Sequence, residues 1–427
     1  MPSETIFALS TGRPPAAIAI IRVSGGLAHA AAERIAGSLP PPREAAVCSF
    51  RHPADGRLID DGLLLCFAGP ASATGEDVAE FHVHGGRAVA DAMLDALTSL
   101  SGLRAALPGE FTRRAFEHGR IDLTEAEGLA DLLEAETESQ RRAAMALADG
   151  GLRRQIEAWQ AQLIELSARA EAAIDYVDED SVAADSTMSS DCGALATVFH
   201  EWLDRPRIEP LRDGVRVVVA GPPNAGKSSL INAIAGSEKA IVTPIAGTTR
   251  DAIEVPLALA GIAIVLTDTA GLRDSSDPVE AIGVDRARSR VESADVLLWL
   301  GEPDAAPAHR RTILVYPRCD QPDRGVAPDG TSAVSSVTGQ GIADLLAAII
   351  GEVRRVIPGE DALALNRRQA AHLAEARDAL REAAAAPDIV FVAEHLRSAR
   401  AAFDRLTGRA GIDDVLDAVF GRFCLGK

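Results

Sequence analysis

The chain has 427 residues, of which 47% are hydrophobic and 4% aromatic, enough for two or three globular domains rich in helix. Its formal net charge of −19 argues against a protein that binds nucleic acid through its overall field, so any contact with RNA must be local. The five cysteines lack metal-ligand spacing, and there is no N-terminal signal or long apolar run, which predicts a reduced cytoplasmic protein without a membrane partner.

Residues 1–121 are expected to form a mixed α+β domain. β-Branched runs at 17–23 and 63–67 are broken by glycine and proline clusters and are interleaved with helical stretches. Glu80, His82 and His84 alternate along one expected strand, so their side chains share a face. A metal site and an ordinary hydrogen-bonded or solvated face both stay open there, and the second is the commoner use of such a pattern.

The sequence becomes helical at residue 122. Thr124 and Glu127 have the spacing of a capping box at a helix start. Farther on, apolar residues recur every three or four positions and predict one face of a long helix; they are Leu152, Ile156, Trp159, Leu163, Leu166, Ala170 and Ile174. A further helix is expected around 194–203, so residues 122–212 are assigned to the first half of a helical domain.

A phosphate-binding loop is the strongest motif in the chain. The apolar run 215–220 precedes Gly221-Pro-Pro-Asn-Ala-Gly-Lys-Ser, which fits GxxxxGK[ST], and a helix-like stretch follows. In such a loop backbone N–H groups surround the phosphates, Lys227 reaches their outer oxygens as a catalytic residue, and Ser228 offers its hydroxyl to Mg²⁺. The predicted nucleotide contacts here are Asn224, Ala225, Gly226, Lys227, Ser228 and Ser229.

Two further motifs follow in the order expected of a GTPase. Residues 243–251 contain Thr249, placed where a switch loop closes on Mg²⁺ and the terminal phosphate. Asp268 follows the apolar run 262–266, which places its carboxylate at a strand end near the metal and the N–H of Gly271 near the terminal phosphate. The predicted contacts are Thr243, Pro244, Ile245, Ala246, Gly247, Thr248, Thr249, Asp268, Thr269, Ala270 and Gly271.

The base-reading motif is degenerate. Guanine recognition commonly uses Asn-Lys-x-Asp after a strand, and this chain has Pro317-Arg318-Cys319-Asp320 after the apolar run 312–316. Asp320 can still accept hydrogen bonds from two guanine N–H groups, and the stem of Arg318 can stack under the base. The lost asparagine removes a contact to the base and a brace to the phosphate loop. Ser335 and Ser336 are expected to close the pocket through a backbone N–H, so GTP is the predicted nucleotide and ATP the alternative.

The residue that orients the attacking water differs from the Ras scheme, because Leu272 stands where a glutamine would follow the Asp268 motif. Glu280 is the candidate for positioning water through a second water, and its ordinary alternative is a solvated glutamate. No arginine of the phosphate loop is placed to act as a finger, but Asn224 can help to hold a monovalent cation over the phosphates. The nucleotide domain is assigned to residues 213–351.

Helical patterning resumes after residue 351, with apolar positions at 373 and 380, in 391–403 and in 415–420. Helices on both sides of a compact α/β unit indicate that the nucleotide domain is inserted into a helical domain, whose second half is 352–427 with the terminus Phe-Cys-Leu-Gly-Lys. Arginine groups are candidates for a local RNA contact or for plain solvated helix faces; they are Arg113, Arg114 and Arg120, then Arg141, Arg142, Arg153 and Arg154, then Arg354, Arg355, Arg367 and Arg368.

Together these motifs resemble one family, the tRNA-modification GTPases called MnmE or TrmE, over the whole length of the chain. The resemblance rests on Ile-Ile-Arg22-Val-Ser-Gly, Thr-Gly75-Glu-Asp-Val-x-Glu80, His84-Gly-Gly, Pro108-Gly-Glu-Phe-Thr-x-Arg114-Ala-Phe, Asp122-Leu-Thr-x-Ala-Glu127, the inserted GTPase with Gly-Thr-Thr-Arg-Asp, and the terminal Phe-Cys-Leu-Gly-Lys. It implies an N-terminal α+β dimerising domain that binds a folate such as 5,10-methylenetetrahydrofolate, a helical-bundle domain, and an inserted P-loop GTPase domain of doubly wound α/β fold.

The resemblance also implies roles for particular residues. The folate site of the family falls on Arg22, Glu80, Arg120 and Lys427, although lysine is usual at position 120. Its K⁺ ligands fall on Asn224, Thr243, Ile245 and Thr248, and its catalytic glutamate falls on Glu280. Cys424 matches a terminal cysteine of the family, for which a role in the chemistry and a structural role both stay open.

Members of the family form homodimers and act with an FAD-dependent flavoprotein, MnmG, as a heterotetramer on the wobble uridine of certain tRNAs. The resemblance therefore implies K⁺-stimulated GTP hydrolysis coupled to modification of C5 to an aminomethyl or carboxymethylaminomethyl form. The rival interpretation is an RNA- or ribosome-associated GTPase that acts only as a binding switch. One departure concerns the guanine side of the pocket, because residues 299–311 leave little room for the helix that commonly joins two of the strands.

Overall fold

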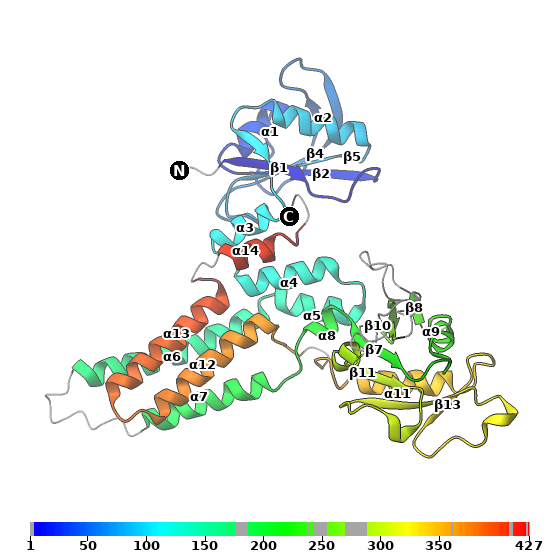
Figure 1. Ribbon diagram of the computed structural model, residues 1–427. Coiled ribbons are helices and arrows are strands. Elements are labelled where there is room, and N and C mark those ends of the chain that lie inside the picture. The colour runs from blue at the N-terminus through cyan, green and yellow to red at the C-terminus, as the bar shows by residue number, and fades with distance from the viewer. Residues whose placement is uncertain are drawn as a thin grey trace, which may run out of the picture. The chain divides into compact units, whose positions relative to one another are not determined.

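The computed structural model describes residues 4–175, 187–237, 240–242, 254–269, 288–359, 362–409, 413–423 and 426. The chain divides into two compact units, one of Met1–Ala130 with Asp404–Lys427 and one of Asp131–Phe403 (Figure 1). The first unit thus combines residues from both ends of the sequence. The finer division into 1–121, 122–212, 213–351 and 352–427 stays a prediction. Among the helices that the structure describes, none is long and apolar enough to cross a bilayer.

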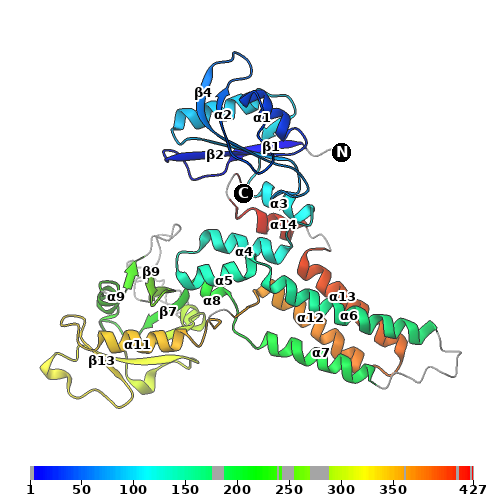
Figure 2. The same ribbon diagram turned by 180° about the vertical axis from the view of Figure 1, so that it is seen from behind.

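The first unit is built on a six-stranded sheet. Its elements are β1 (Thr5–Leu9), β2 (Ile18–Ser24), α1 (Ala28–Ala36), β3 (Ala46–Arg51), β4 (Leu58–Phe67), β5 (Val78–His84), α2 (Arg87–Thr98) and β6 (Leu103–Ala105). The strand order is β3-β4-β5-β2-β1-β6, and all neighbours are antiparallel except β1 and β6. Helices α1 and α2 lie together on one face of this sheet (Figures 1 and 2).

Side-chain alternation along β2 and β5 separates an apolar face from a polar one. Ile21, Val23 and Phe81 are buried in the core beneath the helices. Arg22 and Glu80 alternate with these residues, so they point to the opposite face, where they are only partly buried. The β-branched runs predicted to be strands are confirmed as parts of β2 and β4.

The C-terminal helix α14 (Asp413–Phe420) packs in the first unit with α3 (Glu110–Glu117) and α4 (Leu123–Glu134). The ring of Phe420 lies 6.0 Å from that of Phe116. Gly109 caps α3 with φ 71°, and a Cβ at this position would overlap the carbonyl oxygen of Phe420. Beyond α14, Ser10 Oγ donates to the carbonyl oxygen of Gly426 at 3.0 Å. Gly426 is therefore held beside the end of β1.

The start of α4 differs from the predicted capping box. The N–H of Glu125 donates to Asp122 Oδ1 at 2.9 Å, and the N–H of Asp122 donates to Glu125 Oε2 at 2.7 Å. The reciprocal box is thus formed by Asp122 and Glu125, so the assignment to Thr124 and Glu127 is wrong. Thr124 lies inside the helix, where its hydroxyl donates to Asp122 Oδ1 at 2.7 Å. Asp122 takes the capping position because its carboxylate accepts hydrogen bonds both from the N–H of Glu125 and from the hydroxyl of Thr124.

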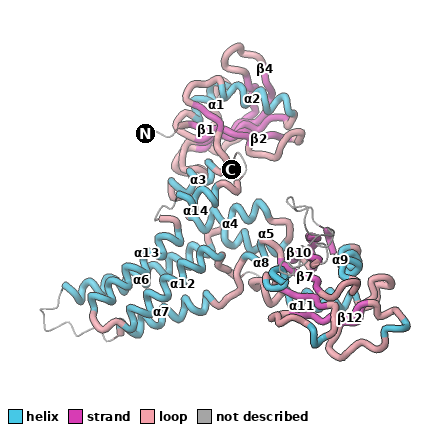
Figure 3. The backbone as a smooth tube through the Cα atoms, in the orientation of Figure 1, coloured by secondary structure: helices cyan, strands magenta, loops and turns pink. Residues whose placement is uncertain are grey.

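The second unit contains a helical bundle (Figure 3), and aromatic side chains meet in its core. Its helices are α5 (Glu138–Ala148), α6 (Gly151–Asp175), α7 (Met188–Leu203), α8 (Glu209–Arg212), α12 (Arg367–Ala385) and α13 (Ile389–Thr407). The ring of Trp159 in α6 lies 5.2 Å from Phe199 in α7 and 6.3 Å from Phe403 in α13. Helices before and after the nucleotide domain therefore share one core, as insertion requires. The predicted long helix is confirmed as α6.

The nucleotide domain of the second unit is built on a seven-stranded sheet. Its elements are β7 (Val215–Ala220), α9 (Lys227–Ala235), β8 (Ala240–Val242), β9 (Glu254–Leu259), β10 (Ile262–Asp268), β11 (Val296–Trp299), β12 (Thr312–Pro317), β13 (Ser332–Val334) and α11 (Ile342–Val353). The strand order is β13-β12-β11-β7-β10-β9-β8; β9 is antiparallel to both of its neighbours, β10 and β8, and the other adjacent strands are parallel. Helices α9 and α11 bury the valines of β7 on one face (Figure 2). This is the predicted doubly wound α/β arrangement.

The two connections that flank β12 are short and contain no α-helix, and every residue of both is described. The first holds only the 3₁₀ turn η1 (Pro303–Ala305), and the second holds only η2 (Pro322–Arg324). The predicted lack of room for a helix before β12 is thus confirmed. A pocket of about 300 Å³ opens at the carboxyl ends of β11 and β12, next to the phosphate loop.

Candidate nucleotide site

The phosphate loop joins the end of β7 to the start of α9. Asn224 and Gly226 have φ of 61° and 93°, which are left-handed values that glycine adopts without steric cost and asparagine more readily than most residues. The ammonium of buried Lys227 folds back over the loop and donates to the carbonyl oxygens of Gly221 at 3.1 Å and Pro222 at 2.9 Å. A cation and the first N–H groups of a helix thus meet at one place, which is the arrangement that binds phosphate.

A hydroxyl and a carboxylate lie together beside this loop. Ser228 Oγ donates to Oδ2 of Asp268 at 2.5 Å, and Asp268 is 0% exposed. They meet because β10 pairs in parallel with β7, so both strands end at the same edge of the sheet. Thr269, which follows, donates through its hydroxyl to Val219 O at 3.1 Å. Paired hard oxygen donors are what Mg²⁺ prefers, so Ser228 and Asp268 fit the predicted metal.

The base-reading residues are gathered by contacts between two turns. Asp320 is exposed in the turn after β12, and the N–H of Cys319 in that turn donates to the last carbonyl of β13 at 3.1 Å. Ser335 is fully buried and uses its own N–H on the carbonyl of Gln340 at 2.9 Å. Of the two serines, Ser336 is therefore the one whose N–H has no acceptor among the described residues. The N–H of Ser336 is therefore available for the closing contact predicted for this loop, and that contact stays a prediction.

Arg318 contacts the phosphate loop from the base-reading side. Its Nη2 donates to the carbonyl oxygen of Asn224 at 2.9 Å. Its Nε lies 3.9 Å from where a Cβ on Gly226 would stand, so the guanidinium crosses the loop. The sequence suggested only that the stem stacks under the base, and it missed this hydrogen bond. Pro317 could have indicated it, because asparagine at that position commonly braces the phosphate loop and proline has no side chain that can do so.

Several predicted site residues lie outside the described residues, and the structure tests none of them. They are Thr243, Pro244, Ile245, Ala246, Gly247, Thr248, Thr249, Ala270, Gly271, Glu280, Cys424 and Lys427. Two other predicted contacts are described: Ala225 is half-buried in the loop, and Ser229 is exposed in the first turn of α9. The described part of the site therefore consists of the phosphate loop, the end of β10 and the two base-reading turns.

Two of the residues assigned to folate lie together on the polar face of the first sheet. Arg22 and Glu80 are directly opposite on β2 and β5, and Arg22 Nε donates to Glu80 Oε1 at 2.8 Å. His82 Nε2 lies 3.5 Å from Glu80 Oε2 and continues the polar row. Arg120 is exposed after α3 and forms no ion pair with a described residue. His84 pairs with a carboxylate of β4 at 2.9 Å, and no described group of three His, Cys, Asp or Glu is arranged to hold a metal.

The arginine groups singled out for RNA are largely engaged in ion pairs. Arg141 and Arg142 both pair with Glu138, at 2.8 Å and 3.0 Å. Arg114 is buried and pairs with Glu76 at 2.8 Å. These side chains therefore support the local fold, and they add little free positive charge to an acidic protein.

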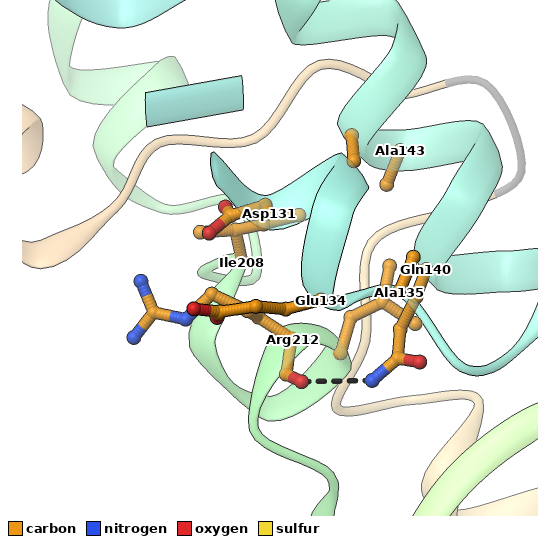
Figure 4. Close-up of a pocket in the computed structure, with 9 residues that line it drawn as sticks. Asp131, Glu134, Ala135, Gln140, Ala143, Ile208 and Arg212 are labelled. Carbon is orange, nitrogen blue, oxygen red and sulfur yellow. Dashed lines mark hydrogen bonds between the residues drawn. The ribbon is translucent and has the colours of Figure 1, made fainter. Parts of the chain in front are cut away.

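Helix α5 joins the bundle to the nucleotide domain within the second unit. Figure 4 shows Gln140 pointing toward Arg212 of α8, whose carbonyl oxygen accepts its side-chain N–H at 2.8 Å. None of the predicted nucleotide contacts lines the pocket drawn there. The N–H of Ser139 donates to Gly261 O, at 3.4 Å, in the tight turn between β9 and β10. The start of α5 thus contacts both α8, which precedes β7, and the turn between β9 and β10.

Comparison with known proteins agrees with the geometry. A family model described as the MnmE helical domain matches residues 123–424, and one described as the GTP-binding protein TrmE N-terminus matches residues 5–120. A tRNA modification GTPase MnmE of Novosphingobium aromaticivorans is 50% identical over 100% of both chains. That of Rhizorhabdus wittichii is 53% identical over 100% of this chain and 97% of its own. The chain belongs to the MnmE family of tRNA modification GTPases.

Membership of the MnmE family confirms the predicted fold class, with its N-terminal TrmE domain, helical domain and GTPase domain. Among solved structures, the G domain of the T. maritima FeoB iron transporter is 27% identical over 32% of this chain and 98% of its own. Its TM-score of 0.24 is too low to support an inference. Within the MnmE framework, Pro317 and Arg318 stand out as departures from Asn-Lys-x-Asp.

Proposed function

We propose that this chain hydrolyses GTP with stimulation by K⁺ and takes part in the modification of C5 of the wobble uridine, position 34, of certain tRNAs. The observation that carries the proposal is the Ser228–Asp268 pair at 2.5 Å beside buried Lys227, in a chain that matches tRNA modification GTPases over its full length. Lys227, Ser228 and Asp268 are in place on the phosphate side, while the base-reading motif is degenerate, so hydrolysis is better supported than selectivity for the base.

The chain's own residues divide the work of hydrolysis. Lys227 neutralises the outer phosphate oxygens, while Ser228 and, from the switch loop, Thr249 hold Mg²⁺. Asp268 keeps the serine hydroxyl in place through its short hydrogen bond. Glu280 orients the attacking water through a second water, because the chain has Leu272 where Ras-like proteins have glutamine. Asp320 and the N–H of Ser336 read the guanine.

The second positive charge of the site comes from a bound K⁺ in place of an arginine finger. Asn224 fits this role, because its side chain is exposed at the loop and makes no hydrogen bond with a described residue. The oxygens of Thr243, Ile245 and Thr248 complete the proposed ligand set. Together these residues would hold K⁺ beside the phosphates, where it would supply positive charge to the transition state.

The modification chemistry belongs to the first unit and to partners. The Arg22–Glu80 pair, Arg120 and Lys427 are proposed to bind a tetrahydrofolate that supplies the methylene carbon, and the Ser10–Gly426 hydrogen bond at 3.0 Å holds the terminus near β1. The chain acts as a homodimer, in a heterotetramer with an FAD-dependent MnmG-type flavoprotein, on tRNA in the cytoplasm. Cys424 is proposed to take part near the folate.

GTP hydrolysis measured in KCl and in NaCl at equal ionic strength tests the proposal. A several-fold higher turnover in KCl is expected, because K⁺ is the cation assigned to the proposed ligand set. Equal rates in the two salts, with retained binding of ribosomal RNA, would favour the rival binding switch.

Competition between GTP and ATP for the empty protein tests the base-reading side separately. GTP should displace a fluorescent GDP analogue at far lower concentration than ATP, because Asp320 accepts from N–H groups that adenine lacks. Equal potency would mean that the degenerate motif no longer reads the base.

A further inference from the structure

The turn after β12 is held by Arg324 of the following connection and by Tyr316 of β12 itself. Arg324 Nε donates to the carbonyl oxygen of Pro317 at 3.2 Å, and the Arg324 guanidinium lies 4.8 Å from the centre of the Tyr316 ring. The hydroxyl of Tyr316 donates to the carbonyl oxygen of Arg324. These contacts fold the connection back on the strand end, in a domain where no α-helix covers it.

From this turn a single side chain reaches the phosphate loop. Arg318 has φ 61°, so its backbone turns the side chain away from the course of β12. Its guanidinium donates to Asn224 O at 2.9 Å. Proline at 317 has no side-chain amide to make such a contact. The turn and the loop are therefore linked through Arg318 at the point where an asparagine brace is missing.

We propose that Arg318 is a positioning residue that ties the base-reading turn to the phosphate loop and takes over the brace lost with asparagine at position 317. The inference rests on the proposed GTP site and adds to it a residue that acts through Asn224. Arg318 suits this task because its charged planar group stays protonated and donates a strong hydrogen bond to a carbonyl oxygen.

The brace acts on the conformation of the loop. Asn224 is left-handed at φ 61°, a conformation that asparagine adopts more readily than most residues and that a hydrogen bond to its carbonyl oxygen helps to hold. The hydrogen bond from Arg318 fixes the Asn224 carbonyl and with it the direction of the neighbouring N–H groups that face phosphate. Without this bond the phosphate loop is held less firmly in its binding conformation, so nucleotide dissociates faster. The base contact at Asp320 is unchanged.

Dissociation of a fluorescent GDP analogue from the full chain tests the inference. Arg318→Met keeps the apolar stem and removes the donor, and it should raise the dissociation rate about tenfold, the size expected for loss of one hydrogen bond from a charged group. Arg318→Lys keeps a donor and should restore most of the retention. The matched control is Arg310→Met, because Arg310 is also exposed in a connection of β12 and should leave the rate unchanged.

Two further readouts separate the brace from other roles. The preference for GDP over IDP, which tests contact with the guanine 2-amino group, should stay the same in Arg318→Met, and so should the thermal midpoint of the nucleotide-free protein. If Arg318→Met dissociates GDP at the wild-type rate and only Arg318→Ala is faster, the stem stacks under the base and the inference is overturned. A wild-type chain that fails to bind GDP at all would instead remove the proposed function together with this inference.

Discussion

At the scale of single residues, the proposed hydrolysis mechanism depends on one carboxylate outside the described residues, Glu280. Glu280→Ala should lower kcat for GTP roughly 100-fold or more, the range for loss of a group that positions or accepts a proton, with GDP affinity within about twofold. Single-turnover hydrolysis and fluorescent GDP titration measure the two quantities. Glu292→Ala, at an exposed glutamate of the same domain, is the control. Unchanged turnover in Glu280→Ala would refute the assigned role.

The buried ion-pair network of the first unit gives a prediction for pH. Burial alone would raise the pKa of Glu110, but hydrogen bonds from Arg104 and from the N–H of Leu107, with a further one from Arg114, hold it below the ordinary value of 4.5. A carboxyl whose pKa is lower in the folded state stabilises that state fully above its unfolded pKa, and the stabilisation is lost as pH falls through the folded pKa.

Thermal unfolding of the wild type and Glu110→Gln checks this sign. The wild type should be more stable at neutral pH, and its advantage should shrink on acidification below about pH 4.5, where the unfolded chain begins to take up the proton. An advantage that stays constant or grows toward acid pH would contradict the account.

At the scale of elements, the docking of α14 on α3 depends on the absence of a side chain at position 109. Gly109→Ala should weaken this docking by roughly 1–3 kcal/mol, because the added Cβ meets the carbonyl of Phe420 as well as an unfavourable φ of 71°. Gly119→Ala is the matched control, since Gly119 has φ 67° but open space around it. Hydrogen exchange in α14 should accelerate much more in the first variant; equal effects would mean that backbone strain alone is responsible.

Most helices and strands could be predicted from periodicity and local motifs, but the residues at which they begin and end could not. The run 215–220 became β7 and the stripe that begins at Leu152 became α6, because in both cases the apolar pattern decides which face is buried. The start of α4 failed, since Asp122 and Thr124 both resemble caps and only the folded geometry selects between them. Arg318 was missed for a similar reason: a hydrogen bond across 94 residues of sequence leaves no local pattern.

At the scale of the whole molecule, the family could be recognised from motifs that lie far apart in the sequence. The resemblance assigned Arg22 and Glu80 to one folate site, and the sheet register, which brings them directly opposite each other, came only from the structure. What sequence could not supply is the way the two ends of the chain combine in one unit, where Ser10 holds Gly426. That contact holds Gly426 beside the end of β1.

Mass spectrometry of wobble uridines from cells that lack this protein tests the central claim most directly. The account predicts that the aminomethyl-type groups on C5 disappear, that the wild-type gene restores them, and that Lys227→Ala does not, because the modification needs a working phosphate site. Wobble uridines that remain fully modified in the deleted cells would contradict the account.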